Sequence, residues 1–124
     1  MTDHELIGLA AKAAGIEVHE SDDGTIQRRP IWACTHYVMD QPYGEFAYNP
    51  LRESGQALDL AVKLRMIVLP DEDQKGPVRY TMVENTLHTE MARCIMFRED
   101  WGNDPFAATR RAIVRAAAQI GGAA

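Results

Sequence analysis

The stretch Asp104–Ile120, DPFAATRRAIVRAAAQI, specifies the most complete element of this chain. Asp104 is a favourable N-cap residue, and Pro105 suits the first turn of a helix. Gly121 and Gly122 favour the end of that helix. At about 100° per residue, one face carries Phe106, Ile113, Ala117 and Ile120. The stretch therefore predicts a helix that buries this face in a core.

Three arginines divide over the surface of this helix. Arg110 lies at the edge of the apolar face, whereas Arg111 and Arg115 point away from it. The simplest interpretation is that Arg111 and Arg115 are solvated. Arg110 would then pair with a neighbouring carboxylate while its aliphatic stem covers the core edge. The alternative is that Arg110 binds an anionic ligand.

Two more helices are predicted upstream. Thr2 and Glu5 match the T-x-x-E capping box, so a helix is expected over about 3–14, with Gly15 after its end. A second helix is expected from Ser54 to about Arg65, because its apolar residues recur at helical spacing. Both helices are amphipathic and need a partner surface.

Three apolar segments follow the second helix, and each predicts a strand: Met66–Leu69, Val78–Glu84 and Met91–Arg98. Consecutive strands with short connections favour an antiparallel meander. Three amphipathic helices are available to cover both faces of this sheet or only one. We therefore predict an α+β fold in which three helices cover a small antiparallel sheet.

Residues 16–50 show the weakest periodicity. Thr25–Arg28 is expected to begin a strand, and Ile31–Val38 is rich in the β-branched and aromatic residues of strands. Glu45–Tyr48 suits a short return strand. The pairing of Ile31–Val38 with Glu45–Tyr48 would form a hairpin that extends the sheet.

Composition bounds the class of protein. A chain of 124 residues, 46% of them hydrophobic, is expected to form a single domain over 1–124. The net charge of −5 argues against general nucleic-acid binding. No apolar run has the length of a membrane span, and residues 1–15 do not resemble a signal peptide. Cys34 and Cys94 are too few for a disulfide framework, which favours the cytoplasm.

Four stretches carry a resemblance: Asn49-Pro50-Leu51, Ser54–Leu58, Leu60–Leu64 and Asp104–Ala117. They resemble small phage and prophage proteins of the phage α-β-α (ABA) sandwich domain group, over roughly 1–15 and 48–120. In this group an aromatic residue, often Trp, precedes Asn-Pro-Leu, and Tyr48 stands there in this chain. The resemblance implies a sandwich fold, a phage origin with the bacterial cytoplasm as location, and an accessory role. It carries over no catalytic residue.

Motifs for catalysis or metal binding are absent from the sequence. It has no P-loop, GxGxxG, GxSxG or HExxH. Cys34 and His36 share one side of a predicted strand and Cys94 lies on a later one, but a zinc site needs more ligands at recognisable spacing. The two cysteines are better interpreted as small buried residues. We therefore expect no enzymatic activity, catalytic residue, metal or cofactor.

Arginines and aromatic residues give the best candidates for a binding site. Arginine suits bidentate recognition of phosphate and carboxylate, and aromatic rings can stack on a base. A nucleotide-like ligand is therefore a candidate partner. The candidate ligand-binding residues are Arg110, Trp32, Tyr37, Tyr48, Arg28 and Arg93.

Three functions remain open at this level. The first is a non-enzymatic binder that sequesters a nucleotide signal in counter-defence. The second is an inhibitor of a host defence or replication protein, which would act through the acidic loops Ser21–Gly24 and Asp71–Asp73. The third is a structural or self-associating domain. The edge strands Thr25–Arg28 and Met91–Arg98 offer pairing surfaces for a homo-oligomer.

Overall fold

The computed structural model of the chain describes residues 1–20, 24–28, 37–38, 41–42, 46–70, 79–84 and 96–122. In chain order the elements are α1 (Asp3–Ala13), β1 (Val18–Glu20), β2 (Ile26–Arg28), β3 (Tyr37–Val38), β4 (Gln41–Pro42), β5 (Phe46–Ala47), α2 (Ser54–Lys63), β6 (Ile67–Pro70), β7 (Tyr80–Glu84), β8 (Met96–Asp100) and α3 (Pro105–Gly122). Three helices and small antiparallel sheets confirm the predicted α+β class.

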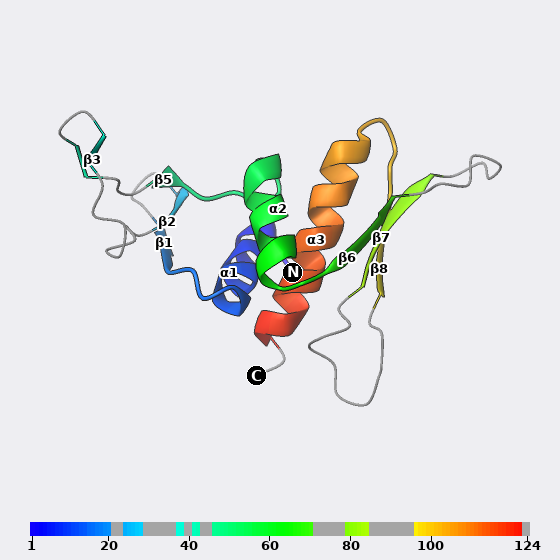
Figure 1. Ribbon diagram of the computed structural model, residues 1–124, viewed down its shortest axis with the longest axis horizontal. Coiled ribbons are helices and arrows are strands. Elements are labelled where there is room, and N and C mark those ends of the chain that lie inside the picture. The colour runs from blue at the N-terminus through cyan, green and yellow to red at the C-terminus, as the bar shows by residue number, and fades with distance from the viewer. Residues whose placement is uncertain are drawn as a thin grey trace.

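The helices lie between two three-stranded sheets (Figure 1). One sheet is the predicted meander β6-β7-β8, and all three helices are on the same side of it. The other has the order β1-β2-β5 and lies beyond α1 and α2. Of the two arrangements that the sequence left open, helices on one face of the meander is therefore the one observed. The layer order is sheet, helices, sheet rather than helix, sheet, helix.

Most of Ile31–Val38, the first half of the predicted hairpin with Glu45–Tyr48, lies outside the described residues, and the described parts of the two segments do not pair with each other. Phe46 and Ala47 pair with β2, whereas β3 pairs with β4. The physical reason is the burial of Tyr48, whose backbone N–H donates to the carbonyl oxygen of Ile26 over 2.8 Å. Tyr48 and Ile26 join the same apolar cluster, so the strand that ends at Tyr48 is held beside β2.

Helix α3 is the central helix against which several other elements pack. It contacts α1, α2, β7 and β8. Most of its circumference is buried, because its small side chains let neighbouring backbones approach closely. The buried residues are Ala108, Ala112, Ile113, Val114, Ala116, Ala117, Ala118 and Gly121. The starts of α1 and α3 are capped as expected, but α3 runs through Gly121 and Gly122, which were expected to end it. Thr2 Oγ1 accepts from the Glu5 N–H at 3.2 Å, and Asp104 Oδ1 accepts from the Ala107 N–H at 3.0 Å.

Phe106 departs from the predicted core face of α3, since 72% of its surface is exposed. Ile113 and Ala117 of the same face are buried as expected. The difference follows from where α2 begins. Arg110 meets Ser54 at the first residue of α2, and Phe106 lies one turn of α3 further toward the N-terminus. Helix α2 therefore does not extend far enough to cover Phe106.

A chain of hydroxyl groups joins β7 to the start of α3. Trp101 Nε1 donates to Thr81 Oγ1 at 2.8 Å, and Thr81 Oγ1 lies 2.8 Å from Thr109 Oγ1. Thr109 Oγ1 in turn donates to the carbonyl oxygen of Pro105 at 2.8 Å. A threonine hydroxyl has a single proton. Thr109 uses it for Pro105, so Thr81 must donate to Thr109 and accept from Trp101.

Replacing Thr81 with valine is expected to lower the free energy of unfolding by about 1–3 kcal/mol, because the half-buried Trp101 and Thr109 lose their hydrogen bonds to the hydroxyl. Urea denaturation of the full chain measures the change. Thr81→Ser is the matched control, since it keeps the hydroxyl and loses one methyl group worth about 0.8 kcal/mol. A valine variant at least as stable as the serine variant would contradict the proposed hydroxyl chain.

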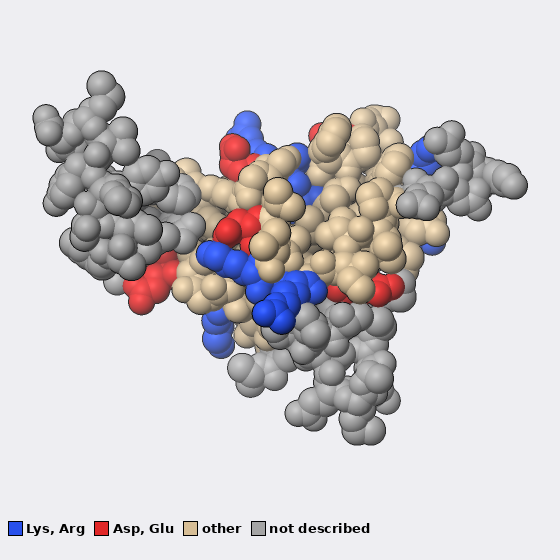
Figure 2. Space-filling view, in the orientation of Figure 1, with Lys and Arg blue, Asp and Glu red and all other residues tan. Residues whose placement is uncertain are grey.

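None of the helices among the described residues is both long and apolar enough to span a membrane. In Figure 2, the face that carries α2 shows basic and acidic side chains interspersed over the described residues. This face of the described chain thus offers no continuous basic surface for a nucleic-acid backbone.

Candidate functional site: a cleft beside the turn before α2

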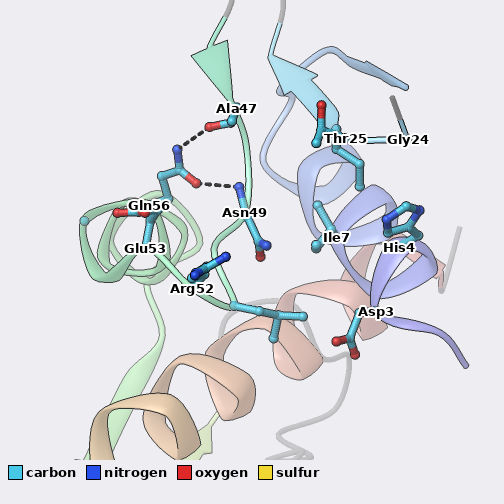
Figure 3. Close-up of a pocket in the computed structure, with 13 residues that line it drawn as sticks. Asp3, His4, Ile7, Gly24, Thr25, Ala47, Asn49, Arg52, Glu53 and Gln56 are labelled. Atoms are coloured by element: carbon cyan, nitrogen blue, oxygen red, sulfur yellow. Dashed lines mark hydrogen bonds between the residues drawn. The ribbon is translucent and has the colours of Figure 1, made fainter. Parts of the chain in front are cut away.

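A cleft of about 910 Å³ opens between α1, the start of β2 and the segment that leads from β5 into α2 (Figure 3). Its floor is apolar and its rim is polar. The lining residues are Asp3, His4, Ile7, Gly24, Thr25, Ile26, Ala47, Asn49, Leu51, Arg52, Glu53, Gly55 and Gln56.

The wall on the α2 side is a turn, Asn49–Ser54, held by hydrogen bonds from two directions. Within the turn, the carbonyl oxygen of Asn49 accepts from the N–H groups of Arg52 and Glu53 at 3.0 and 2.9 Å. From α2, Gln56 Oε1 accepts from the Asn49 N–H at 2.7 Å. Gln56 Nε2 donates to the carbonyl oxygen of Ala47 at 3.0 Å. A single glutamine thus joins the end of β5 to the start of α2.

Arg110 on α3 forms two hydrogen bonds to this turn. Its Nε donates to the carbonyl oxygen of Leu51 at 2.9 Å, and its Nη1 donates to Ser54 Oγ at 3.0 Å. The two expected partners of Arg110 were a carboxylate or a ligand. The structure gives it a backbone carbonyl and a hydroxyl instead, and Arg110 is not among the residues that line the cleft.

The cleft carries charges of both signs. Arg52 is exposed and lines the cleft on the side of the turn, across from α1 (Figure 3). On the opposite wall, Asp3 pairs with Arg111 at 3.3 Å, and His4 Nδ1 lies 3.7 Å from Glu20 Oε1. Glu53 is the N-cap residue of α2 but makes no side-chain capping bond. The carboxylate of Glu53 therefore offsets part of the positive charge that Arg52 and this helix end bring to the cleft.

Asn49 has an unusual side-chain environment. Its Oδ1 is buried and has no hydrogen-bond partner among the described residues. A buried acceptor left without a partner costs about 1–3 kcal/mol. A buried polar group of this kind in a native structure is explained by strain, by an ordered water or ion, or by a functional role.

Of the ligand-binding residues proposed from sequence, Tyr48 and Arg110 have described side chains, and neither lines the cleft. Tyr48 is only 1% exposed and packs with Ile7, Ala11 and Ile16, so it lies in the core. The backbones of Arg28 and Tyr37 lie in β2 and β3, but their side chains lie outside the described structure. Trp32 and Arg93 also fall outside the described residues, as do Cys34, His36 and Cys94.

The other two helix arginines form surface ion pairs. Arg111 pairs with Asp3, and Arg115 pairs with Glu99 on β8 while its guanidinium lies over the ring of Phe97. The sequence predicted them to be solvated, and both lie at the surface as expected. Exposed pairs of this kind contribute little stability.

Sequence reasoning missed Arg52, His4 and Gln56 as parts of a cleft. The available signal was the position of Arg52, directly after Asn-Pro-Leu and just before a helix start, because such turns often carry binding residues. Among the described residues, no group of three or more His, Cys, Asp or Glu side chains is placed to hold a metal ion. No known protein family, curated protein or solved structure matches this chain.

Proposed function

We propose that this chain is a non-enzymatic binding protein whose cleft holds a small anionic ligand of nucleotide-like size. One observation carries the proposal. Arg52 lines a cleft of about 910 Å³ and stands on a turn that Gln56 and Arg110 both hold. Small-molecule sites commonly have volumes of about 300–1,000 Å³.

The charges favour an anionic group on the ligand. Arginine binds phosphate and carboxylate groups with two parallel hydrogen bonds. The start of α2 contributes positive potential beside Arg52, and the first turn of α2 has no acidic residue, although the carboxylate of the N-cap residue Glu53 also lines the cleft. Asp3, across the cleft, has part of its charge balanced by Arg111. The ligand's anionic group is thus expected beside the turn and its uncharged part over Ile7 and Ile26.

The biological role follows from the resemblance to phage proteins. In a bacterial cytoplasm, a phage protein that binds a nucleotide without turning it over would remove a signal from a host immune system. Sequestration is therefore the role that we propose for the cleft. Whether one chain or a homo-oligomer forms the complete site is measured by light scattering with and without ligand.

A second candidate is an inhibitor that binds a host protein. On the exposed side of α2, Leu58 and Val62 lie one turn apart and are 62% and 67% exposed. Two large apolar side chains on one flank of a helix are typical of a protein-binding surface. The acidic loops that first suggested this function lie outside the described residues, apart from Gly24.

Arg52→Ala tests the proposal. We expect wild type to bind at least one member of a panel of inorganic phosphate, cyclic nucleotides and ADP-ribose derivatives in calorimetry. The variant should bind it about 10- to 100-fold more weakly, because a charge-assisted hydrogen bond contributes about 1.5–3 kcal/mol. Its thermal stability should be close to that of wild type, because Arg52 is exposed.

Lys12→Ala is the matched control for this experiment. It removes the same charge from an exposed site about two turns along α1 from His4, and Lys12 does not line the cleft. Its affinity should equal that of wild type. Absence of binding by wild type to every member of the panel would refute the proposal, as would equal losses in the Arg52 and Lys12 variants.

A further inference from the structure

We infer that Arg110 is the positioning residue of the cleft: it orders the Asn49–Ser54 turn before any ligand arrives. The importance of this order for binding rests on the proposed function. The order itself belongs to the free protein and is measurable without a ligand.

The geometry of Arg110 suits this role. Its Nε and Nη1 reach two groups on the turn, the carbonyl oxygen of Leu51 at 2.9 Å and Ser54 Oγ at 3.0 Å. These groups stand on either side of Arg52 in the sequence. The backbone of Arg52 thus lies between two contacts to a single planar guanidinium. A lysine ammonium cannot form these two hydrogen bonds in the same geometry.

The support under the guanidinium is rigid. Arg110 stands on α3, two residues before a run of buried side chains at Ala112, Ile113 and Val114. Each of these packs in the main apolar cluster of the protein. The turn is therefore tied to the most constrained helix of the fold, 59 residues away in sequence from Leu51.

Loss of the two hydrogen bonds from Arg110 loosens the turn but does not unfold it. The bonds from Gln56 and those to the carbonyl oxygen of Asn49 remain. Leu51 and Arg52 then gain backbone freedom that a ligand must remove on binding. Fixing the backbone of one residue costs about 1–2 kcal/mol, so affinity should fall by about 5- to 30-fold.

Two substitutions separate positioning from charge. Arg110→Lys keeps the positive charge and loses the paired contacts, whereas Arg110→Gln loses both. Positioning predicts similar effects from the two variants. A long-range attraction between Arg110 and an anion predicts a loss only in Arg110→Gln, and that loss should shrink as salt is added.

The experiment uses the full chain and two readouts. The first is the NMR order parameter of the backbone N–H groups of Leu51, Arg52 and Glu53 in the free protein. We expect a fall from about 0.85, typical of rigid backbone, toward 0.6 in both Arg110 variants. The second readout is the affinity for inorganic phosphate. It is measured from the changes in NMR chemical shift of the same N–H groups as phosphate is added.

Arg115→Lys and Arg115→Gln are the matched controls, because Arg115 lies on the same helix and pairs with Glu99 on the side of β8. They should leave the turn unchanged. Ser54→Ala is a milder variant that removes only one of the two contacts, and it should give an intermediate order parameter.

Unchanged order parameters in Arg110→Lys, Arg110→Gln and Ser54→Ala would overturn the inference. So would full recovery by lysine. A disordered turn in both Arg110 variants supports it, whether or not phosphate binds. If wild type shows ordered turn residues but no binding to phosphate or to the nucleotide panel, the proposed function fails while the inference about Arg110 stands.

Discussion

Replacing Gly121 with alanine is expected to lower the free energy of unfolding by about 3 kcal/mol, at the upper end of the range for overpacking. Helix propensity alone predicts the opposite sign, because alanine is favoured over glycine inside a helix by about 1 kcal/mol. The clash decides the sign. A Cβ atom at Gly121 would lie 2.0 Å from the carbonyl oxygen of Leu9 and 2.8 Å from its carbonyl carbon. These are backbone atoms of α1, which cannot rotate away as a side chain can.

Gly122→Ala is the control for this experiment. A Cβ atom there would lie 3.8 Å from Leu9 Cδ1, which is ordinary contact distance, so the variant should be at least as stable as wild type. Urea denaturation monitored by circular dichroism compares the two variants. Equal stability of Gly121→Ala and Gly122→Ala would show that α1 and α3 do not approach each other as closely as the structure indicates.

Replacing Leu60 with alanine is expected to cost about 2–5 kcal/mol, the range for large-to-small changes in a core. Leu60 on α2 is 0% exposed and belongs to the same cluster as Val83 on β7 and Val114 on α3. The lost side chain leaves a cavity between α2, β7 and α3. Because such packed elements relax only partly, the cost includes both the lost burial and the cavity.

Leu58→Ala is the matched control, two residues away on the same helix. Leu58 is 62% exposed, so the same change should alter stability by no more than about 0.5 kcal/mol. The comparison cancels helix propensity, since both sites exchange leucine for alanine in α2. A large loss in Leu58→Ala would mean that its flank is covered in solution, which would favour the protein-binding candidate or self-association.

The helices could be predicted from the sequence because their determinants are local. Thr2 and Asp104 form the capping bonds that their residue types suggest. Phe106 shows the limit of this reasoning. Its position on the helical face is correct, but burial also requires a partner element at the same level, and the start of α2 at Ser54 decides that.

The two three-stranded sheets differ in how far they could be predicted. The meander follows from apolar segments in a row, and its strands were found in the right order. In the other sheet, β1 has three residues and β5 has two, too few for a period to appear. The pairing of β5 with β2 depends on the burial of Tyr48, which sequence reasoning had assigned to a binding site.

The cleft was not predictable residue by residue. Charge patterns indicated that Arg110 needs a partner, and a carboxylate was the natural expectation. Its observed partner is a backbone carbonyl, at Leu51, and any residue type supplies one. Arg52 becomes a binding candidate only once Gln56 and Arg110 hold its turn against α1. Both conditions arise from tertiary contacts that leave no mark on local composition.

The place of α3 in the fold has a consequence for biosynthesis. Elements emerge from the ribosome in chain order, and α3, over Pro105–Gly122, is the last of the described elements. Until α3 emerges, the meander and the helices α1 and α2 lack the helix against which they pack. We therefore expect the nascent chain to remain open through most of its synthesis. The core should close in a single late step, after residue 122 has left the ribosomal tunnel.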